Sequence, residues 1–449
     1  MTTVERGGPN IPPIVSIDDH LVEPPDTFTG RLPARLADAA PHVEVDPDGT
    51  EKWVFDGQRH GQIGLNAVVG RPRSEYGMEP TAISQMREGA YDVHKRVDDM
   101  NVNGLLASLN FGTFVGFDGG FFRDAKDKTL AHAMVQAYND WHIDEWCGAY
   151  PGRFIPMAIL PTWNIDQTVE EIKRVVKKGC HAVAFSDNPS LKGLPSIHNA
   201  YWEPLWKVCA DNHVVLNCHI GTGAAAAHPS MESPIDAWIT GMPMSIANSA
   251  SDWLQLNALQ RYPDLKVALS EGGIGWVPYF LERADFTFEH HHEWTHTDFG
   301  GKKPSDIFRE HFITCFIDDK HGVKNRADIG VDIICYECDY PHSDTLWPEA
   351  PEYLMGNFAG CSDEDIDKIT HLNAMRTYSF DPFKDIPREQ CTVGALRAKA
   401  THVDTTPRSK PGKRPIAEGD MRVVTSADVM KLFAETGRDA RAGKSKEPA

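Results

Sequence analysis

Eight short apolar runs of strand-like composition recur along this 449-residue chain, and helical stretches separate them. Between the third and the fourth, apolar residues return at helical spacing from Ile165 to Val176, and Gly179 marks the end of that helix. Alternating strands and helices predict a parallel sheet, and eight strands are the number of a closed (β/α)8 barrel. A doubly wound open sheet is the competing architecture, but no Gly-x-Gly-x-x-Gly turn or phosphate loop follows any run. The runs span residues 14–18, 105–110, 154–160, 181–186, 214–219, 266–271, 312–317 and 332–339.

Two segments look like additions to this α/β barrel. Residues 46–80 are polar and rich in glycine, which predicts an insertion over the barrel mouth. After Gln390 the composition shifts to Lys, Arg, Pro, Thr and Gly, with one short amphipathic stretch, SADVMKLF. We therefore expect a barrel domain over residues 1–390 and an extension over 391–449. The extension is expected to be an arm that packs on another subunit of a homo-oligomer, with a disordered end.

The net charge of the chain limits the kinds of molecule that it can bind. The chain carries 45 basic and 64 acidic residues, a formal net charge of −19. Nucleic-acid binders and proteins of anionic membranes need a basic surface, so neither class is expected, and a small-molecule substrate is the expected partner. No apolar run is long enough to span a bilayer, and the N-terminus lacks the apolar core of a signal peptide. Nine scattered cysteines do not form a disulfide framework, which favours the reducing cytoplasm.

Polar side chains close the first and fifth runs. In IVSIDDH, Ser16, Asp18 and His20 are expected on one face, because side chains alternate along a strand. His219 closes VVLNCH and precedes a glycine-rich turn. An imidazole at the catalytic end of a barrel strand suits a metal ligand, because it binds zinc, iron or manganese without adding charge. For each motif alone, a strand cap or a hydrogen-bonded structural histidine is the alternative interpretation.

Acidic side chains close the sixth and eighth runs. Glu271 ends ALSE before two glycines, and Asp339 ends DIICYECD, where it can ligate a metal or act as a general base. The first and eighth strands of a closed barrel are neighbours, and the fifth lies across the axis. Asp18, His20, His219 and Asp339 are therefore predicted to converge on one divalent ion at the barrel mouth. Mixed nitrogen and oxygen donors suit zinc or manganese.

Three further residues are candidates for substrate binding. Arg71 and Arg73 lie in the insertion and could clamp a substrate carboxylate, although most loop arginines are only solvated. His342 follows Asp339 closely and could support that acid, or it could be an ordinary loop residue.

The motifs SIDDHLVEP, LNCHIGTG, LSEGGIGW and ECDYPHSD together resemble the amidohydrolase superfamily. They are most similar to its amidohydrolase-related branch, which includes aminocarboxymuconate-semialdehyde decarboxylase and the γ-resorcylate decarboxylases. PGRFIPMAILP, PSDIFREHF and NAMRTY also resemble that branch, so the resemblance covers about residues 10–385.

This resemblance implies a metal-dependent TIM barrel. By its motifs, Asp18 and His20 would be first-strand ligands, His219 the fifth-strand ligand and Asp339 the eighth-strand acid. The chain departs from the His-x-His form of the first strand, where Val22 takes the second histidine position. Glu23 lies one residue further on and could substitute as a ligand if the turn curls inward. Glu271 stands where the branch usually has a histidine.

Three functions follow as alternatives. In the first, the metal holds a small, aromatic or unsaturated carboxylic acid that loses carbon dioxide, and Asp339 or Glu271 protonates the remaining carbon. In the second, Asp339 takes a proton from water for the hydrolysis of an amide, ester, lactone or carbon–carbon bond. In the third, the barrel is a binding or scaffold protein. The closest resemblance favours the decarboxylase.

Overall fold

The fold is built on one parallel sheet, seen in a computed structural model that describes residues 11–77, 80–223, 227–410, 412–417 and 419–436. The sheet has nine strands in the order β6-β5-β1-β12-β11-β10-β9-β8-β7, and every pairing within it is parallel. Each of the eight predicted runs overlaps at least one of these strands, and the run 154–160 contains two of them. Their bounds are β1 Val15–Leu21, β5 Ala107–Gly112, β6 Phe154–Ile155, β7 Met157–Ala158, β8 Ala182–Ser186, β9 Val215–His219, β10 Lys266–Ser270, β11 Phe312–Phe316 and β12 Ile334–Tyr336.

The sheet closes on itself through its two outer strands. β6 pairs with β5, β7 pairs with β8, and only Pro156 separates β6 from β7. Proline has no N–H to donate, so the ladder is interrupted at that residue. The two edges of the sheet are thus one extended segment. The result is the (β/α)8 barrel that the sequence predicts.

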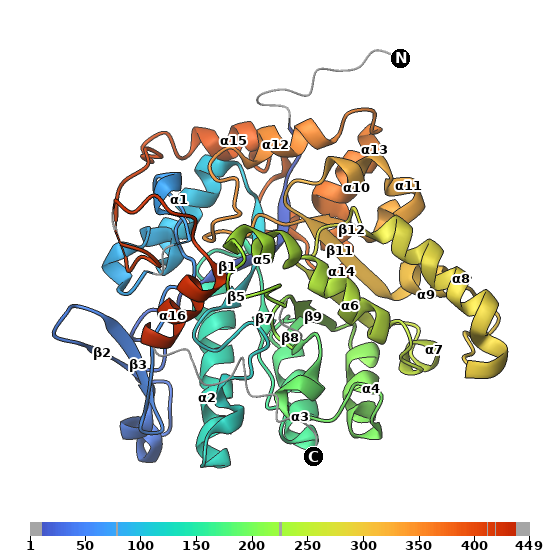
Figure 1. Cartoon of the computed structure of the whole chain (residues 1–449), viewed down its shortest axis with the longest axis horizontal. Helices are drawn as coiled ribbons and strands as arrows, with labels where there is room; N and C mark the ends of the chain where they lie inside the picture. The colour runs from blue at the N-terminus through green and yellow to red at the C-terminus, as the bar shows by residue number, and fades with distance from the viewer. Residues whose placement is uncertain (1–10, 78–79, 224–226, 411, 418, 437–449) are drawn as a thin grey trace.

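Helices surround the barrel (Figure 1). α3 bears out the expected helix: Ile172 is buried, Ile165, Val169 and Val176 are partly buried against the core, and Gly179 follows with a φ of 82°. The stretch after Ser362, whose side chain caps α13 by accepting the N–H of Asp365, is helical but contains a π-helical turn at Lys368–Leu372. The larger helices are α1 Val93–Asn103, α2 Lys128–Asp140, α3 Ile165–Val176, α4 Glu203–Asp211, α6 Met244–Trp253, α8 Val277–Thr295, α9 Pro304–His311, α12 Ala350–Asn357 and α16 Ser426–Thr436. The shorter ones are α5 Ile235–Gly241, α7 Ala258–Arg261, α10 Lys320–Lys324, α11 Arg326–Ile329, α13 Asp363–Asp367, α14 Asn373–Thr377 and α15 Val393–Ala398. No helix within the described residues has the length and apolarity needed to cross a bilayer.

The N-terminal insertion contains a small antiparallel sheet. It consists of β2 His42–Val45, β3 Glu51–Phe55 and β4 Gln58–His60, so it begins slightly before the expected boundary at residue 46. Trp53 anchors this sheet, because its buried ring stacks on Phe114 at a centroid distance of 4.4 Å. Further along, Asn66 Nδ2 donates to Ser343 Oγ at 3.0 Å. The insertion therefore packs against the loop that follows β12, at the carboxyl end of the barrel.

The described part of the C-terminal extension lies along its own chain. Val393 and Leu396 of α15 are buried, and the backbone N–H of Arg408 donates to Gly70 O. The Ser409 hydroxyl donates to Glu75 and the backbone N–H of Lys410 to the same carboxylate. Packing on a second subunit remains a prediction. The expected disordered end falls at 437–449, outside the described residues.

Candidate metal centre

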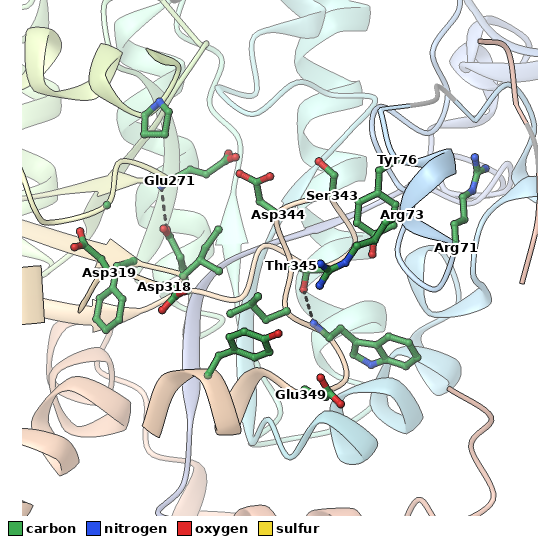
Figure 2. A pocket seen from close by; sticks show the side chains of 18 of the residues that line it. Arg71, Arg73, Tyr76, Glu271, Asp318, Asp319, Ser343, Asp344, Thr345 and Glu349 are labelled. Atoms are coloured by element: carbon green, nitrogen blue, oxygen red, sulfur yellow. Dashed lines mark hydrogen bonds between the residues drawn. The ribbon is translucent and has the colours of Figure 1, made fainter. Parts of the chain in front are cut away.

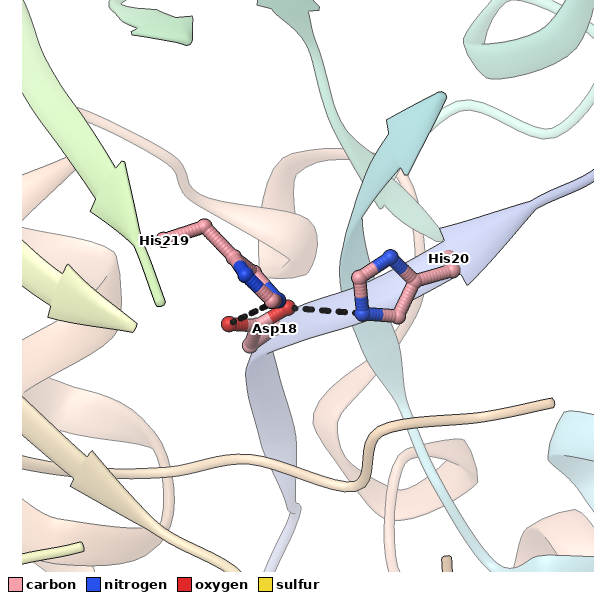
Figure 3. A group of neighbouring side chains, drawn as sticks. All are labelled: Asp18, His20 and His219. Carbon is pink, nitrogen blue, oxygen red and sulfur yellow. Dashed lines mark ion pairs between the residues drawn. The ribbon is translucent and has the colours of Figure 1, made fainter. Parts of the chain in front are cut away.

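Strand ends bring the predicted ligands together at one end of the barrel. Asp18 and His20 lie in β1, His219 is the last residue of β9, and Glu271 and Asp339 directly follow β10 and β12. In a parallel barrel all strands end on the same side, so residues far apart in the chain meet there. Figure 3 shows His20 and His219 on opposite sides of the Asp18 carboxylate.

The distances define a compact group. His20 Nε2 lies 3.5 Å from Asp18 Oδ1, and His219 Nε2 lies 3.8 Å from Asp18 Oδ2. One ligand atom from each of these three residues lies within 4.8 Å of the others. Asp339 joins through His20, whose Nε2 is 3.2 Å from Asp339 Oδ1, in an overlapping group with His342. The structure thus places all four predicted ligands in contact, in two groups that share His20.

The donor set fits a divalent cation. Asp18 and His20 are fully buried, yet within the described part of the chain neither the carboxylate oxygens of Asp18 nor the ring nitrogens of His20 have a hydrogen-bond partner. Buried polar atoms without partners are costly and rare in folded proteins. A cation bound between two imidazoles and a carboxylate would satisfy them, and these are the donors that zinc and manganese accept.

An irregularity in the pairing of β1 with β5 changes which side chains of β1 face this site. The pairing of β1 with β5 shifts between Ser16 and Asp19, as in a β-bulge. The Ser16 hydroxyl bonds Asp19 Oδ1 at 3.0 Å, on the side where Arg96 approaches the Asp19 carboxylate. The expectation that Ser16 shares a face with Asp18 and His20 is therefore wrong. Arg96 also donates to the backbone carbonyl of His20, which fixes that part of the strand.

Glu271 holds His219 from the other side. Its Oε2 lies 2.8 Å from His219 Nε2, while His219 Nδ1 lies 2.8 Å from Ile220 O, so both ring nitrogens are engaged. Burial alone lowers the pKa of His219, but the carboxylates of Asp18 and Glu271 outweigh it and raise that pKa to about 9. Glu271 has a φ of 60°, in the left-handed region, and its N–H donates to Glu337 Oε2 at 3.0 Å. Such conformations in non-glycine residues concentrate at functional sites.

Asp339 shares this conformation, with a φ of 55°. Its Oδ1 lies 2.8 Å from His342 Nδ1, so His342 contacts the acid beside which the sequence places it. Burial raises the pKa of Asp339 well above its usual value, and the nearby carboxylate of Glu271 raises it further. The ring of His342 also stacks on His20 at a centroid distance of 3.9 Å. His342 thus packs within the metal group as well as beside the acid.

Glu23 points elsewhere. Its carboxylate accepts the backbone N–H groups of Phe114 at 2.7 Å and Val115 at 3.3 Å. The turn after β1 therefore does not bring Glu23 into the metal group. Phe117 lies there instead, with its ring centroid 4.4 Å from that of His20 and 4.5 Å from that of His219.

A cavity of about 670 Å³ adjoins the metal group. Glu271 and Glu337 line one side of it, and Arg71 and Arg73 line another. In Figure 2 Arg73 extends toward Thr345 in the middle of the cavity, whereas Arg71 lies at its far edge. Arg71 is buried and donates to the carbonyl of Gln85 at 2.8 Å, so its guanidinium is tied to the insertion.

Two side chains of the site were not predicted from the sequence. Cys315 and Glu337 form a third group with Asp18, within the same 4.8 Å limit. Glu337 lies two residues before Asp339 in DIICYECD, and the alternation of side chains along a strand places both on one face, which was a usable signal. Cys315 lies inside an apolar run, and nothing in the sequence around it distinguishes a ligand from a core residue.

A parallel barrel in which β6 and β7 together take the place of one of eight strands, with buried imidazoles and carboxylates at the carboxyl ends of its strands, has the architecture of a metal-dependent (β/α)8 enzyme. The chain belongs to the amidohydrolase family, whose family model matches residues 92–380. That match contains His219, Glu271 and Asp339, while Asp18 and His20 precede it.

Solved structures share the fold. An amidohydrolase from Mycobacterium avium subsp. paratuberculosis aligns with a TM-score of 0.62 at 19% identity, over 82% of this chain and 99% of the other. The 5-carboxyvanillate decarboxylase from Sphingomonas paucimobilis gives 0.56 at 16%, over 82% and 99%. A dihydroxybenzoic acid decarboxylase from a Polaromonas species, solved with manganese and 2-nitroresorcinol, gives 0.54 at 17%, over 84% and 99%. At these identities the likeness concerns the fold.

Proposed function

We propose that this chain is a metal-dependent decarboxylase of a small aromatic or unsaturated carboxylic acid. The observation that carries the proposal is the buried group of Asp18, His20 and His219 beside a cavity of about 670 Å³ with arginines on its far side. A cavity of this size suits a small organic ligand. Two of the structures that share the fold are decarboxylases of aromatic acids, and one of those binds manganese, which supports the same chemistry here.

The proposed roles follow from position. Asp18, His20 and His219 would hold the cation, with Asp339 beside them. A divalent cation bound there would supply positive charge that polarises substrate oxygens as bond breaking shifts electrons onto the ring or chain. Arg73 would bind an anionic or hydroxyl group at the other end of the substrate.

Asp339 would return the proton. Burial raises the pKa of this acid, which favours the protonated form that a proton donor needs, and Asp339 would deliver that proton to the carbon that carbon dioxide leaves. Glu271 would keep His219 in place through the 2.8 Å contact. Phe117 packs over both histidines and would limit the access of water to the reacting carbon.

The experiment is a substrate panel with product analysis. Metal-loaded protein would be given hydroxybenzoates and unsaturated dicarboxylic acids, with detection of carbon dioxide. Decarboxylation of at least one class supports the proposal. Arg73→Ala should then raise KM more than it lowers kcat, because the arginine binds substrate without reaching the reacting carbon. Hydrolysis of amide, ester or lactone analogues without carbon dioxide would select the alternative, in which Asp339 takes a proton from water.

We further propose a cytoplasmic homo-oligomer. The nine cysteines are all free thiols, which supports a reducing compartment. The C-terminal extension supports the oligomer, because its stretch from Asp404 to Arg422 has little apolar content with which to form a core of its own. Light scattering of the purified protein gives the oligomer mass directly.

A further inference from the structure

A third cluster of candidate ligands shares Asp18 with the predicted metal centre. Cys315 comes from β11, Glu337 directly follows β12, and Asp18 comes from β1. One ligand atom from each lies within 4.8 Å of the others. All three side chains are at most 1% exposed. The Cys315 thiol donates to Glu337 Oε2 at 2.6 Å.

Asp18 belongs to both clusters. His20 faces one of its oxygens and His219 the other, and Cys315 and Glu337 also lie within ligand distance of this carboxylate. Within the described residues neither oxygen has a hydrogen-bond partner. A carboxylate has two oxygens with about four lone-pair positions, so it can bind two cations at once. Shared carboxylates of this kind connect the ions of two-metal sites, which lie about 3.5–4 Å apart.

The charge balance of the site also favours more than one cation. Asp18, Glu337 and Asp339 are buried and Glu271 is largely buried, and these four acids contact one another or the same histidines. Over the described part of the chain, the ion pairs of Asp18, Glu271 and Asp339 involve only histidines, and Glu337 has none. Buried carboxylates without cationic partners are strongly unfavourable. If Asp339 carries a proton, as in the proposed function, then Asp18, Glu271, Glu337 and a Cys315 thiolate bring four negative charges when the histidines bind metal as neutral ligands. One divalent ion balances two of these charges, which leaves two for a second ion.

We propose that the barrel holds a second divalent transition metal between Asp18, Cys315 and Glu337, with Asp18 bridging it to the ion at His20 and His219. A thiolate ligand favours zinc, cobalt or iron over manganese, so this position differs in preference from the first. On binding, the thiol proton leaves to solvent, and two ligand bonds replace the hydrogen bond between Cys315 and Glu337. Glu337 lines the cavity, which provides the entry path for the ion.

Metal counting tests the proposal directly. The full-length protein would be stripped with a chelator, reloaded with excess zinc or cobalt, desalted and analysed for metal per chain. Wild type should bind about two ions, and Cys315→Ala about one. Cys335→Ala is the matched control, because Cys335 is the register partner of Cys315 on β12 and equally buried, yet belongs to none of the three clusters. It should keep about two ions.

Cobalt spectra give a second readout. Cobalt-loaded wild type and Cys335→Ala should show near-ultraviolet absorption from a thiolate bound to cobalt, and Cys315→Ala should lose it. If Cys315→Ala does not fold, Glu337→Gln keeps the size of the side chain and should lose one ion in the same assay. A wild type that never exceeds one ion, or a Cys315→Ala variant with unchanged load and spectrum, overturns the inference.

The inference does not depend on the reaction. It shares Asp18 with the centre used in the proposed function, so Asp18→Ala should empty both positions. A protein with two ions and no decarboxylation would refute the proposed function and keep the second metal. Decarboxylation by a protein that binds only one ion would do the reverse.

Discussion

At the scale of single residues, His219 is the point on which the first metal position depends. It lies across the barrel axis from β1, and its Nε2 faces both Asp18 and Glu271. His219→Ala is therefore expected to lower zinc or manganese content by about one ion per chain, because an imidazole is removed from the coordination shell. Metal analysis after reconstitution checks this. His290→Ala, on the exposed face of α8, is the control. An unchanged metal content in His219→Ala would contradict the ligand assignment.

Asp339 is the residue on which turnover should depend most. Asp339→Asn keeps the shape and an oxygen donor but cannot transfer a proton. Removal of a general acid or base typically lowers the rate by about 10²–10⁴-fold, and we expect a loss of that size in kcat with metal still bound.

Two measurements make this result specific to proton transfer. Glu271→Gln should lower the rate less, because Glu271 contacts His219 and orients it. The thermal midpoint of Asp339→Asn must stay close to that of wild type, since a buried acid can also stabilise the fold. Near-normal turnover by well-folded Asp339→Asn would refute its role as the proton donor.

At the scale of elements, the π-helical segment Trp141–Cys147 buries a histidine that should make the fold sensitive to acid. His142 is 1% exposed and its Nε2 lies 3.2 Å from Asn110 O. Burial lowers the pKa of His142 to about 4. In the unfolded chain the pKa returns to about 6.5, so between these values the unfolded state binds the extra proton. Stability from this group is therefore present above about pH 6.5 and is lost as the pH falls toward 4.

His142→Gln tests this linkage. An amide can keep the bond to Asn110 O but does not titrate, so the thermal midpoint should fall less between pH 7 and pH 4 than in wild type. His290→Gln, an exposed substitution, should leave the wild-type slope unchanged. Equal slopes for His142→Gln and wild type would show that another group causes the acid sensitivity.

At the scale of the whole molecule, the C-terminal extension combines two parts with different expected roles. α15 is part of the barrel core, since Val393 and Leu396 are each 1% exposed. The following stretch lies on the insertion through Arg408, Ser409 and Lys410. The sequence-based boundary at residue 390 therefore falls before a helix whose apolar side chains pack in the core.

Two truncations separate these roles. A chain that ends at Gln390 should unfold at lower temperature, because each buried aliphatic side chain contributes about 1.5–3 kcal/mol. A chain that ends at Thr401 keeps α15 and should hold its thermal midpoint more closely. If the arm joins subunits, light scattering should show a smaller oligomer for the Thr401 truncation. An unchanged mass would show that the arm serves its own chain alone.

The order of strands and helices and the end of the barrel that carries the site could be predicted from the sequence. Short apolar runs predict the strands, and parallel strands all end on one side of the barrel. Asp18, His20, His219 and Asp339 were therefore expected to meet there. This reasoning needs only the period of a strand and the direction of the chain. It also places Glu271 beside them, and the structure adds that Glu271 contacts His219.

Only the tertiary structure determines which of these side chains come within ligand distance of one another. A register shift after Ser16 turns that residue away from Asp18, the turn after β1 directs Glu23 to the backbone of Phe114, and Cys315 reaches Asp18 from another strand. The apolar run around Pro156 likewise does not indicate that this segment closes the barrel by pairing with β5 on one side and β8 on the other. Sequence patterns report which face of a strand a residue occupies. Whether two such faces meet within ligand distance depends on register, bulges and the width of the barrel, and these are set by the packing of the whole chain.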